Sequence, residues 1–210
     1  MKFEYNEFKV IENELNKEEL RFSESIMYLA NEYMGMRGNF EEKYSGDSLQ
    51  GTYIGGVWFP DKTKVGWWKI GYPEYFGKMI NSPNFIGIGV KIDGQELDLN
   101  VEEIVSYRRE LDMERGLLKR SFEIKRSDKS FQIDVERFVS IDTKEICPIK
   151  YSVRALDAEA LVEFVPYLDA DVENEDSNYE EKFWHVLDKG ARENTGDRKS
   201  TRLNSSHIQK

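Results

Sequence analysis

The stretch VGWWKIGYPEYFGK holds the side chains of this 210-residue chain that are best suited to bind a sugar. Trp67 and Trp68 stand there among Gly66, Gly71 and Gly77. Such glycine-rich sequence indicates a loop, and flat indole faces pack against the apolar faces of sugar rings. We expect Trp67 and Trp68 to contact a sugar. The alternative is that both rings cover the edge of a hydrophobic core, because tryptophan is common in both roles.

Histidine and cysteine are too scarce to support nucleophilic or zinc chemistry. The chain has two histidines, His185 and His207, and one cysteine, Cys147. A nucleophilic triad needs a histidine beside its nucleophile, and nothing in the sequence supports that role for His185. A zinc site built from cysteine and histidine needs more ligands than the chain offers, and one cysteine forms no internal disulfide. We therefore predict no catalytic residue, no metal site and no cofactor.

An acidic stretch, DADVENEDSNYEE, has a superficial likeness to a calcium-binding loop. Asp169, Asp171 and Glu173 occupy alternate positions, and Glu180 is the twelfth residue. The sixth position holds Asn174, where a calcium loop of this type requires glycine for its sharp turn. We expect a solvated acidic loop.

Glu41 and Glu42 form a pair of adjacent carboxylates that suggests acid and base catalysis. Neighbouring side chains on an extended segment point to opposite faces, so the two groups could not flank one bond. We expect one of them to be buried against Arg37 and the other to lie in water.

The periodicity of the chain predicts strands. Apolar and polar residues alternate over 117–126, with Leu118, Phe122 and Ile124 on one face. After a polar turn at 127–130 the alternation resumes, which predicts an antiparallel hairpin. Asp93-Gly94 between two apolar runs predicts another hairpin, because glycine accepts the positive φ of a tight turn. Only residues 17–28 and 101–109 have patterns of short helices, so we predict an all-β sandwich with one or two short helices.

The charge balance excludes several classes of partner. Forty acidic and 30 basic residues give a net charge of −10. Without residues 197–210, 39 acidic residues face 26 basic ones, a net charge of −13. Such a surface repels phosphate backbones and anionic lipids, so we expect no nucleic-acid or membrane partner. The chain has no apolar run typical of a signal peptide or membrane span, and we expect a cytoplasmic protein.

Five segments between Glu19 and Asp188 resemble those of a known family in their order and in their amino-acid sequence: NEYMGMRGNFEE, GYPEYFGKMINSPNF, ELDMERGLLKRSF, ERFVS and NEDSNYEEKFW. They are similar to the amino-terminal region of the glycoside hydrolase family 65 disaccharide phosphorylases, which act on maltose, kojibiose, trehalose and related α-glucosides. The resemblance implies an amino-terminal super-β-sandwich of the galactose mutarotase-like type. It also implies a linker and an (α/α)6 barrel, which carries the general-acid glutamate and the phosphate-binding residues.

The resemblance implies an inverting reaction with inorganic phosphate as co-substrate, a homodimer, and a β-sandwich that is inactive by itself. Maltose is the leading substrate, with kojibiose and trehalose as alternatives. The resemblance places Trp67 and Trp68 near the sugar. Arg37 and Asp47 are further candidates for that site, although both fit a structural ion pair equally well. Two other functions stay open, namely a free-standing sugar-binding β-sandwich and a dimerisation or interaction domain.

The last residues of the chain look foreign to it. DRKSTRLNSSH is the codon-by-codon translation of a widely used short-read sequencing adapter, with all eleven residues in one frame. We interpret residues 1–196 as a β-sandwich domain truncated before the linker and barrel, and 197–210 as an adapter-derived, disordered tail. The alternative is a genuine basic tail, since serine-rich basic termini occur as disordered arms. The source DNA across these codons distinguishes the two.

Overall fold

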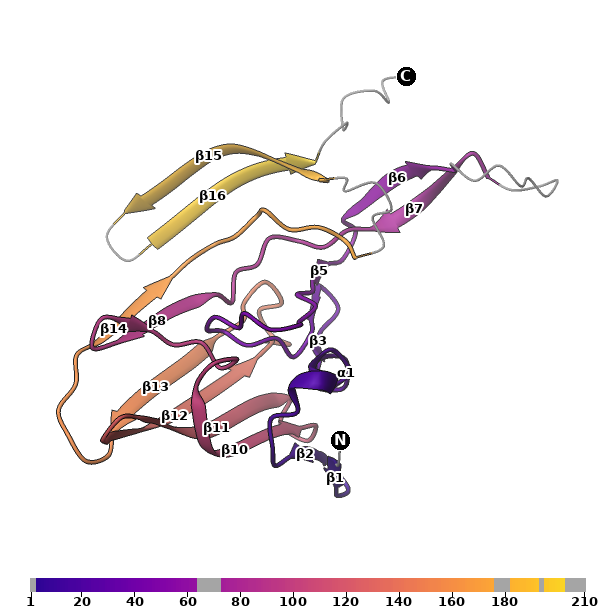
Figure 1. Ribbon diagram of the computed structural model, residues 1–210. Helices are drawn as coiled ribbons and strands as arrows, with labels where there is room; N and C mark the ends of the chain where they lie inside the picture. The colour runs from indigo at the N-terminus through magenta and orange to yellow at the C-terminus, as the bar shows by residue number, and fades with distance from the viewer. Residues whose placement is uncertain (1–2, 64–72, 176–181, 193–194, 203–210) are drawn as a thin grey trace.

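The computed structural model describes residues 3–63, 73–175, 182–192 and 195–202. These residues form antiparallel β-structure with one short α-helix (Figure 1). The helical elements are η1 (Lys17–Glu19) and α1 (Leu20–Ile26). The strands are β1 (Phe3–Tyr5), β2 (Lys9–Glu12), β3 (Leu29–Ala30), β4 (Met34–Met36), β5 (Thr52–Ile54), β6 (Trp58–Lys62), β7 (Tyr75–Met79), β8 (Ile88–Ile92), β9 (Gln95–Glu96), β10 (Glu103–Asp112), β11 (Leu117–Arg126), β12 (Lys129–Phe138), β13 (Ile149–Ala155), β14 (Val162–Pro166), β15 (Trp184–Arg192) and β16 (Thr195–Arg202).

The largest sheet has six antiparallel strands in the order β1-β2-β10-β11-β12-β13. Its centre is a meander of three ten-residue strands, β10 to β12. The predicted alternation over 117–126 is confirmed, since Leu118, Phe122 and Ile124 are all buried on one face. The predicted hairpin is confirmed as well, with register from Leu117 opposite Phe138 to Arg126 opposite Lys129.

A second layer covers the buried face of this sheet. It consists of two three-stranded sheets, β14-β8-β9 and β3-β4-β5, and the first of them lies above the β12–β13 side in Figure 1. One core cluster joins β8 to the meander through residues such as Val90, Phe122 and Ile133. Another joins the β3-β4-β5 sheet to the meander through Met34, Met36 and Leu118, among others. The chain is therefore the predicted all-β sandwich.

The local predictions met different outcomes. Asp93 and Gly94 have φ of 50° and 79°, so the predicted tight turn between β8 and β9 is confirmed. The helix predicted at 17–28 is present as η1 and α1. The helix predicted at 101–109 is wrong, because residues 103–109 belong to β10 and pair with β11. In the described part of the chain, no helix is long and apolar enough to cross a membrane.

The carboxyl-terminal tail needs a correction. Residues 197–202 belong to β16, which pairs with β15 as a separate two-stranded sheet, visible at the top of Figure 1. The prediction that the chain is disordered from 197 onward is therefore wrong for 197–202, where backbone hydrogen bonds of a hairpin order a segment that has few apolar anchors. Residues 203–210 lie outside the described part. The adapter origin of the tail and the domain boundary at 196 stay predictions.

Candidate functional site

A cavity of about 380 Å³ opens between the two parts of the second layer. One wall is the loop of residues 37–51, which connects β4 to β5. The other wall comes from β8, β9 and the residue that follows β14. Aromatic and uncharged polar side chains line most of the cavity, chiefly Phe40, Tyr44, Asn39, Gln50, Asn84 and Tyr167, and the charged residues Glu42, Lys43 and Glu96 complete it.

Three arginines form a layer beneath the cavity loop. Arg109, Arg120 and Arg137 lie on β10, β11 and β12 and are 1%, 5% and 1% exposed. All three side chains point to the interior, in phase with the apolar residues of their strands. Arg109 is directly opposite Arg120 across the two strands, a like-charge pair that is unfavourable unless anions compensate it. The carboxylates that do so belong to Glu12, Glu41 and Glu42.

The three arginines and three glutamates balance in charge, and their ion pairs anchor the loop. Arg120 binds both Glu41 (2.8 Å) and Glu42 (Nη2 to Oε2, 2.6 Å), and Arg137 donates to Glu41 over 2.8 Å. Arg109 binds Glu12 over 2.7 Å and also donates to the carbonyl oxygen of the loop at residue 38 over 2.9 Å. Burial opposes the charge of Arg120, but the Glu42 and Glu41 carboxylates outweigh it and raise the pKa of Arg120 well above its ordinary value.

The expected environment of Glu41 and Glu42 was wrong. Both carboxylates are buried and both contact Arg120, so neither lies in water and neither pairs with Arg37. The rule of opposite faces does not apply because residues 38–42 are irregular rather than extended strand. Tyr151 donates a further hydrogen bond of 3.1 Å to Glu42. These carboxylates hold the loop and are unavailable for acid or base catalysis.

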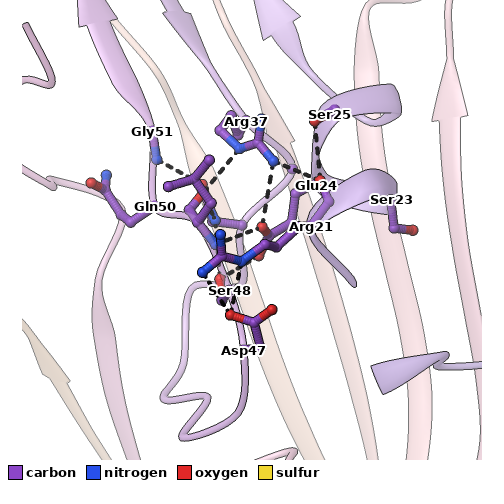
Figure 2. A network of polar contacts seen from close by, with 12 residues as sticks. Arg21, Ser23, Glu24, Ser25, Arg37, Asp47, Ser48, Gln50 and Gly51 are labelled. Carbon is purple, nitrogen blue, oxygen red and sulfur yellow. Dashed lines mark hydrogen bonds and ion pairs between the residues drawn. The ribbon is translucent and has the colours of Figure 1, made fainter. Parts of the chain in front are cut away.

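Arg37 and Asp47 lie in one polar network but do not bond to each other (Figure 2). Arg37 donates to the carbonyl oxygens of Leu49 (2.9 Å) and Arg21 (2.6 Å). Asp47 is exposed and accepts from the guanidinium of Arg21 over 2.8 Å, so Arg21 joins the two. The structure therefore gives Arg37 and Asp47 a role in holding the ends of the cavity loop.

Glu24 of α1 completes the support of this loop. Its carboxylate is 1% exposed, accepts from the backbone N–H of Leu49 over 3.0 Å, and also accepts from the hydroxyl of Ser48. Asn39 closes the loop from within, because its side chain donates to the Leu49 carbonyl (2.9 Å) and accepts from the Gly51 N–H (3.1 Å). The loop is thus fixed at both ends and from below.

Asp98 fixes the middle of the loop and makes it sensitive to acid. Its Oδ1 accepts from the backbone N–H of Ser45 (3.1 Å) and of Asn100 (3.0 Å). Burial raises the pKa of Asp98, but the hydrogen bonds from Ser45 and Asn100 outweigh it and lower the pKa below the ordinary 3.8. A depressed pKa means that the carboxylate stabilises the fold above pH 3.8 and loses that contribution as pH falls through the folded value.

We expect the replacement Asp98→Asn to lower the melting temperature at pH 7 and to have progressively less effect below about pH 4. Asparagine keeps a weaker acceptor for the same N–H groups but does not titrate. Thermal unfolding of both proteins between pH 3 and pH 7 measures the difference. A gap in melting temperature that stays constant over this range would contradict the assignment.

The sequence also pointed to two tryptophans, a histidine and a cysteine. Trp67 and Trp68 lie outside the described residues. His185 and Cys147 are not among the residues that line the cavity. Burial raises the pKa of the Cys147 thiol to about 11, which keeps it protonated and unreactive near neutral pH. In the described ranges, no group of three or more histidine, cysteine, aspartate or glutamate side chains is arranged to hold a metal ion.

The family of the chain is identified by its match to a sequence model built for known proteins. The sequence model of the glycosyl hydrolase family 65 N-terminal domain matches residues 10–209, nearly the whole chain. The chain belongs to glycosyl hydrolase family 65. The resemblance seen in the sequence is thereby confirmed, as is the sandwich expected for the N-terminal domain of that family.

The chain is similar to several curated disaccharide phosphorylases. The chain is 55% identical over 194 residues to maltose phosphorylase of Bacillus subtilis, which covers 92% of the chain and 26% of that protein. It is 31% identical over 156 residues to α,α-trehalose phosphorylase of Thermoanaerobacter brockii, covering 72% of the chain and 20% of that protein. The chain thus spans about a quarter or less of the length of these family members.

A solved structure from the same family agrees in fold. A protein from the human microbiome, provisionally named a kojibiose phosphorylase, superposes with a TM-score of 0.86 at 26% sequence identity. The match covers 96% of the chain and 26% of that protein.

The arginine layer and the cavity were not predicted from the sequence, although the sequence holds a signal for the arginine layer. Arg120 stands between Leu118 and Phe122 in the apolar phase of its strand, where an exposed arginine is out of place. An arginine in that phase needs a buried carboxylate, and adjacent Glu41 and Glu42 supply it. The cavity is formed by segments that are far apart in the sequence, and no local pattern predicts it.

Proposed function

We propose that the chain is the amino-terminal β-sandwich of an inverting α-glucoside phosphorylase whose leading substrate is maltose. The observation that carries the proposal is the 55% identity to maltose phosphorylase over 194 residues, against 31% or less to the trehalose and kojibiose phosphorylases. Family membership supports the reaction class. The homodimer, the cytoplasmic location and a sugar contact by Trp67 and Trp68 belong to the same proposal and rest on the resemblance and the sequence.

The proposed reaction needs little from this domain by way of chemistry. In an inverting hydrolase one carboxylic acid protonates the leaving oxygen while a carboxylate activates water on the opposite face. In a phosphorylase inorganic phosphate replaces that water, so one general acid suffices, and inversion of an α-glucoside yields β-glucose 1-phosphate. The buried carboxylates of Glu12, Glu41 and Glu42 are committed to arginines. The acid and the phosphate site are assigned to the barrel, and the β-sandwich supports it.

A chimera tests the substrate. Residues 10–192 of this chain would replace the matching segment of the Bacillus subtilis maltose phosphorylase, and the same segment would replace its counterpart in a kojibiose phosphorylase. We expect the maltose chimera to release β-glucose 1-phosphate from maltose and phosphate, with the anomer read by NMR. A maltose chimera that folds, as shown by a cooperative melt, but is inactive would overturn the proposal.

We further expect the 210-residue chain alone to release no glucose 1-phosphate from maltose, kojibiose or trehalose. Without a positioned general acid the glycosidic oxygen would depart unprotonated, and phosphate would not be held in line. The measurement is a coupled assay for glucose 1-phosphate on purified chain, with the intact maltose phosphorylase as positive control. Turnover that follows the chain through two purification steps would contradict this expectation.

A further inference from the structure

We propose that the cavity between the 37–51 loop and Tyr167 is a binding site for a neutral sugar, carried by the β-sandwich itself. The site needs no residue of a catalytic barrel and is separate from the activity proposed above. Its volume of about 380 Å³ lies within the range typical of small-ligand sites.

The two tyrosines of the cavity pack closely against glycines. A Cβ at Gly46 would come within 2.6 Å of the Tyr44 ring, and a Cβ at Gly87 within 2.3 Å of the Tyr167 ring. Only glycine lets either ring approach the backbone this closely. The two rings come from opposite walls of the cavity, Tyr44 from the loop and Tyr167 from the end of β14. Backed in this way, both rings present aromatic surface on which a pyranose ring can stack.

Polar groups at the cavity divide into those used by the protein and those left free. Asn39, Ser48 and Gln50 make hydrogen bonds inside the loop and its neighbours. By contrast, the Tyr44 hydroxyl is buried and has no hydrogen-bond partner among the described residues. A buried hydroxyl without a partner is rare and destabilising, so it points to a ligand or an ordered water.

Two more groups at the same cavity are uncommitted among the described residues. Asn84 uses its Oδ1 to accept from the Ile86 N–H over 3.1 Å, while its Nδ2 donates no hydrogen bond there. Tyr167 uses its backbone N–H to bond to the Gly87 carbonyl over 2.9 Å, and its hydroxyl makes no hydrogen bond to any residue that the structure describes. Two hydroxyls and one amide NH2 group therefore remain to bind the hydroxyl groups of a sugar.

The charges at the cavity favour an uncharged ligand. The Glu42 carboxylate is neutralised by Arg120 beneath it, and Lys43 pairs with Glu96 over 2.6 Å at the exposed rim. The cavity thus offers no unpaired cation to a phosphate and no unpaired anion to an amine. Stacking surface, free hydroxyl and amide groups, and balanced charge together describe a site for a neutral polyhydroxy ring.

The test is titration of the 210-residue chain with glucose, maltose and glucose 1-phosphate, followed by calorimetry and ligand-observed NMR. We expect saturable binding of glucose or maltose in the millimolar range and no gain in affinity from the phosphate group. Tyr44→Phe removes only the unpartnered hydroxyl. It should weaken binding about fivefold to tenfold without lowering the melting temperature, whereas a purely structural hydroxyl would leave binding unchanged.

Two further variants locate the site. Asn84→Asp keeps the acceptor for Ile86 and removes the free N–H, and Tyr167→Ala removes a stacking face, so both should weaken binding at least about fivefold. Tyr5→Ala, at an exposed tyrosine outside the cavity, is the matched control and should not change it. Absence of saturable sugar binding, equal binding by all variants, or a clear preference for glucose 1-phosphate would each overturn the inference. None of these results bears on the maltose chimera, so the two proposals fail separately.

Discussion

The variant Arg120→Met is expected to lose about 3–5 kcal/mol of folding free energy, the cost of leaving a buried charge unpaired. Methionine fills much of the same space, so the loss comes chiefly from Glu42, whose carboxylate remains buried without its cation, while Glu41 keeps its ion pair with Arg137. Because domains of this size are stable by only about 5–15 kcal/mol, the variant should be near its unfolding threshold. Equilibrium unfolding in urea at pH 7 measures the change.

Arg108→Met is the matched control for this prediction. Arg108 is the neighbour of Arg109 on β10, but it faces outward, is 46% exposed at its side chain, and pairs with Glu110 at the surface. Its replacement should change stability by about 1 kcal/mol or less. Adding Glu42→Gln to Arg120→Met should recover part of the loss, because it removes one unpaired charge. If Arg120→Met is no less stable than Arg108→Met, the buried carboxylates of Glu41 and Glu42 do not need Arg120 to compensate their charge.

Gly38→Ala is the second variant with a large expected effect. A Cβ at Gly38 would lie 2.8 Å from both the Cβ and the carbonyl oxygen of Met27, which ends α1. Backbone cannot move aside as a flexible side chain can. The Gly38 N–H also donates to the Glu24 carbonyl (2.8 Å), and its carbonyl accepts from Arg109. We expect a loss of about 1–3 kcal/mol, typical of an overpacked core.

Gly35→Ala separates this clash from the general effect of replacing glycine. A Cβ at Gly35 on β4 would lie 3.6 Å from that of Ala30, an ordinary contact. This variant should be neutral or slightly stabilising, because alanine restricts the unfolded chain. Urea unfolding of the two variants side by side gives the comparison. Equal midpoints for Gly35→Ala and Gly38→Ala would show that Met27 yields to the added methyl group.

The sequence predicted those parts of the fold that depend on neighbours along the chain. Alternation over 117–126 and the Asp93-Gly94 turn are local signals, and both hairpins are present. Residues 101–109 were misassigned because their pattern fits both a helix and a strand, and only the pairing of β10 with β11 decides between the two. The same holds at 197–202, where a partner strand orders residues that have little apolar content.

The candidate site was less predictable, for a physical reason. The environment of Glu42 depends on Arg120, which lies 78 residues away in the chain. Likewise, the tyrosines of the cavity stand 123 positions apart in the sequence, at 44 and 167. Local periodicity carries no information on such pairings. It did mark an arginine in the apolar phase of a strand, and that anomaly is the clue that a reader of similar sequences can use.

The arginine layer also sets an order of events during synthesis. Glu12, Glu41 and Glu42 leave the ribosome first, and their partners follow 78 to 97 residues later. At a synthesis rate of about 5–20 residues per second, these glutamates wait for several seconds before their partner arginines emerge from the ribosome. Contacts this distant in sequence form slowly, because a long loop must close before they are made. The 37–51 loop can settle only on a finished meander, so the cavity is among the last parts of the nascent chain to take shape.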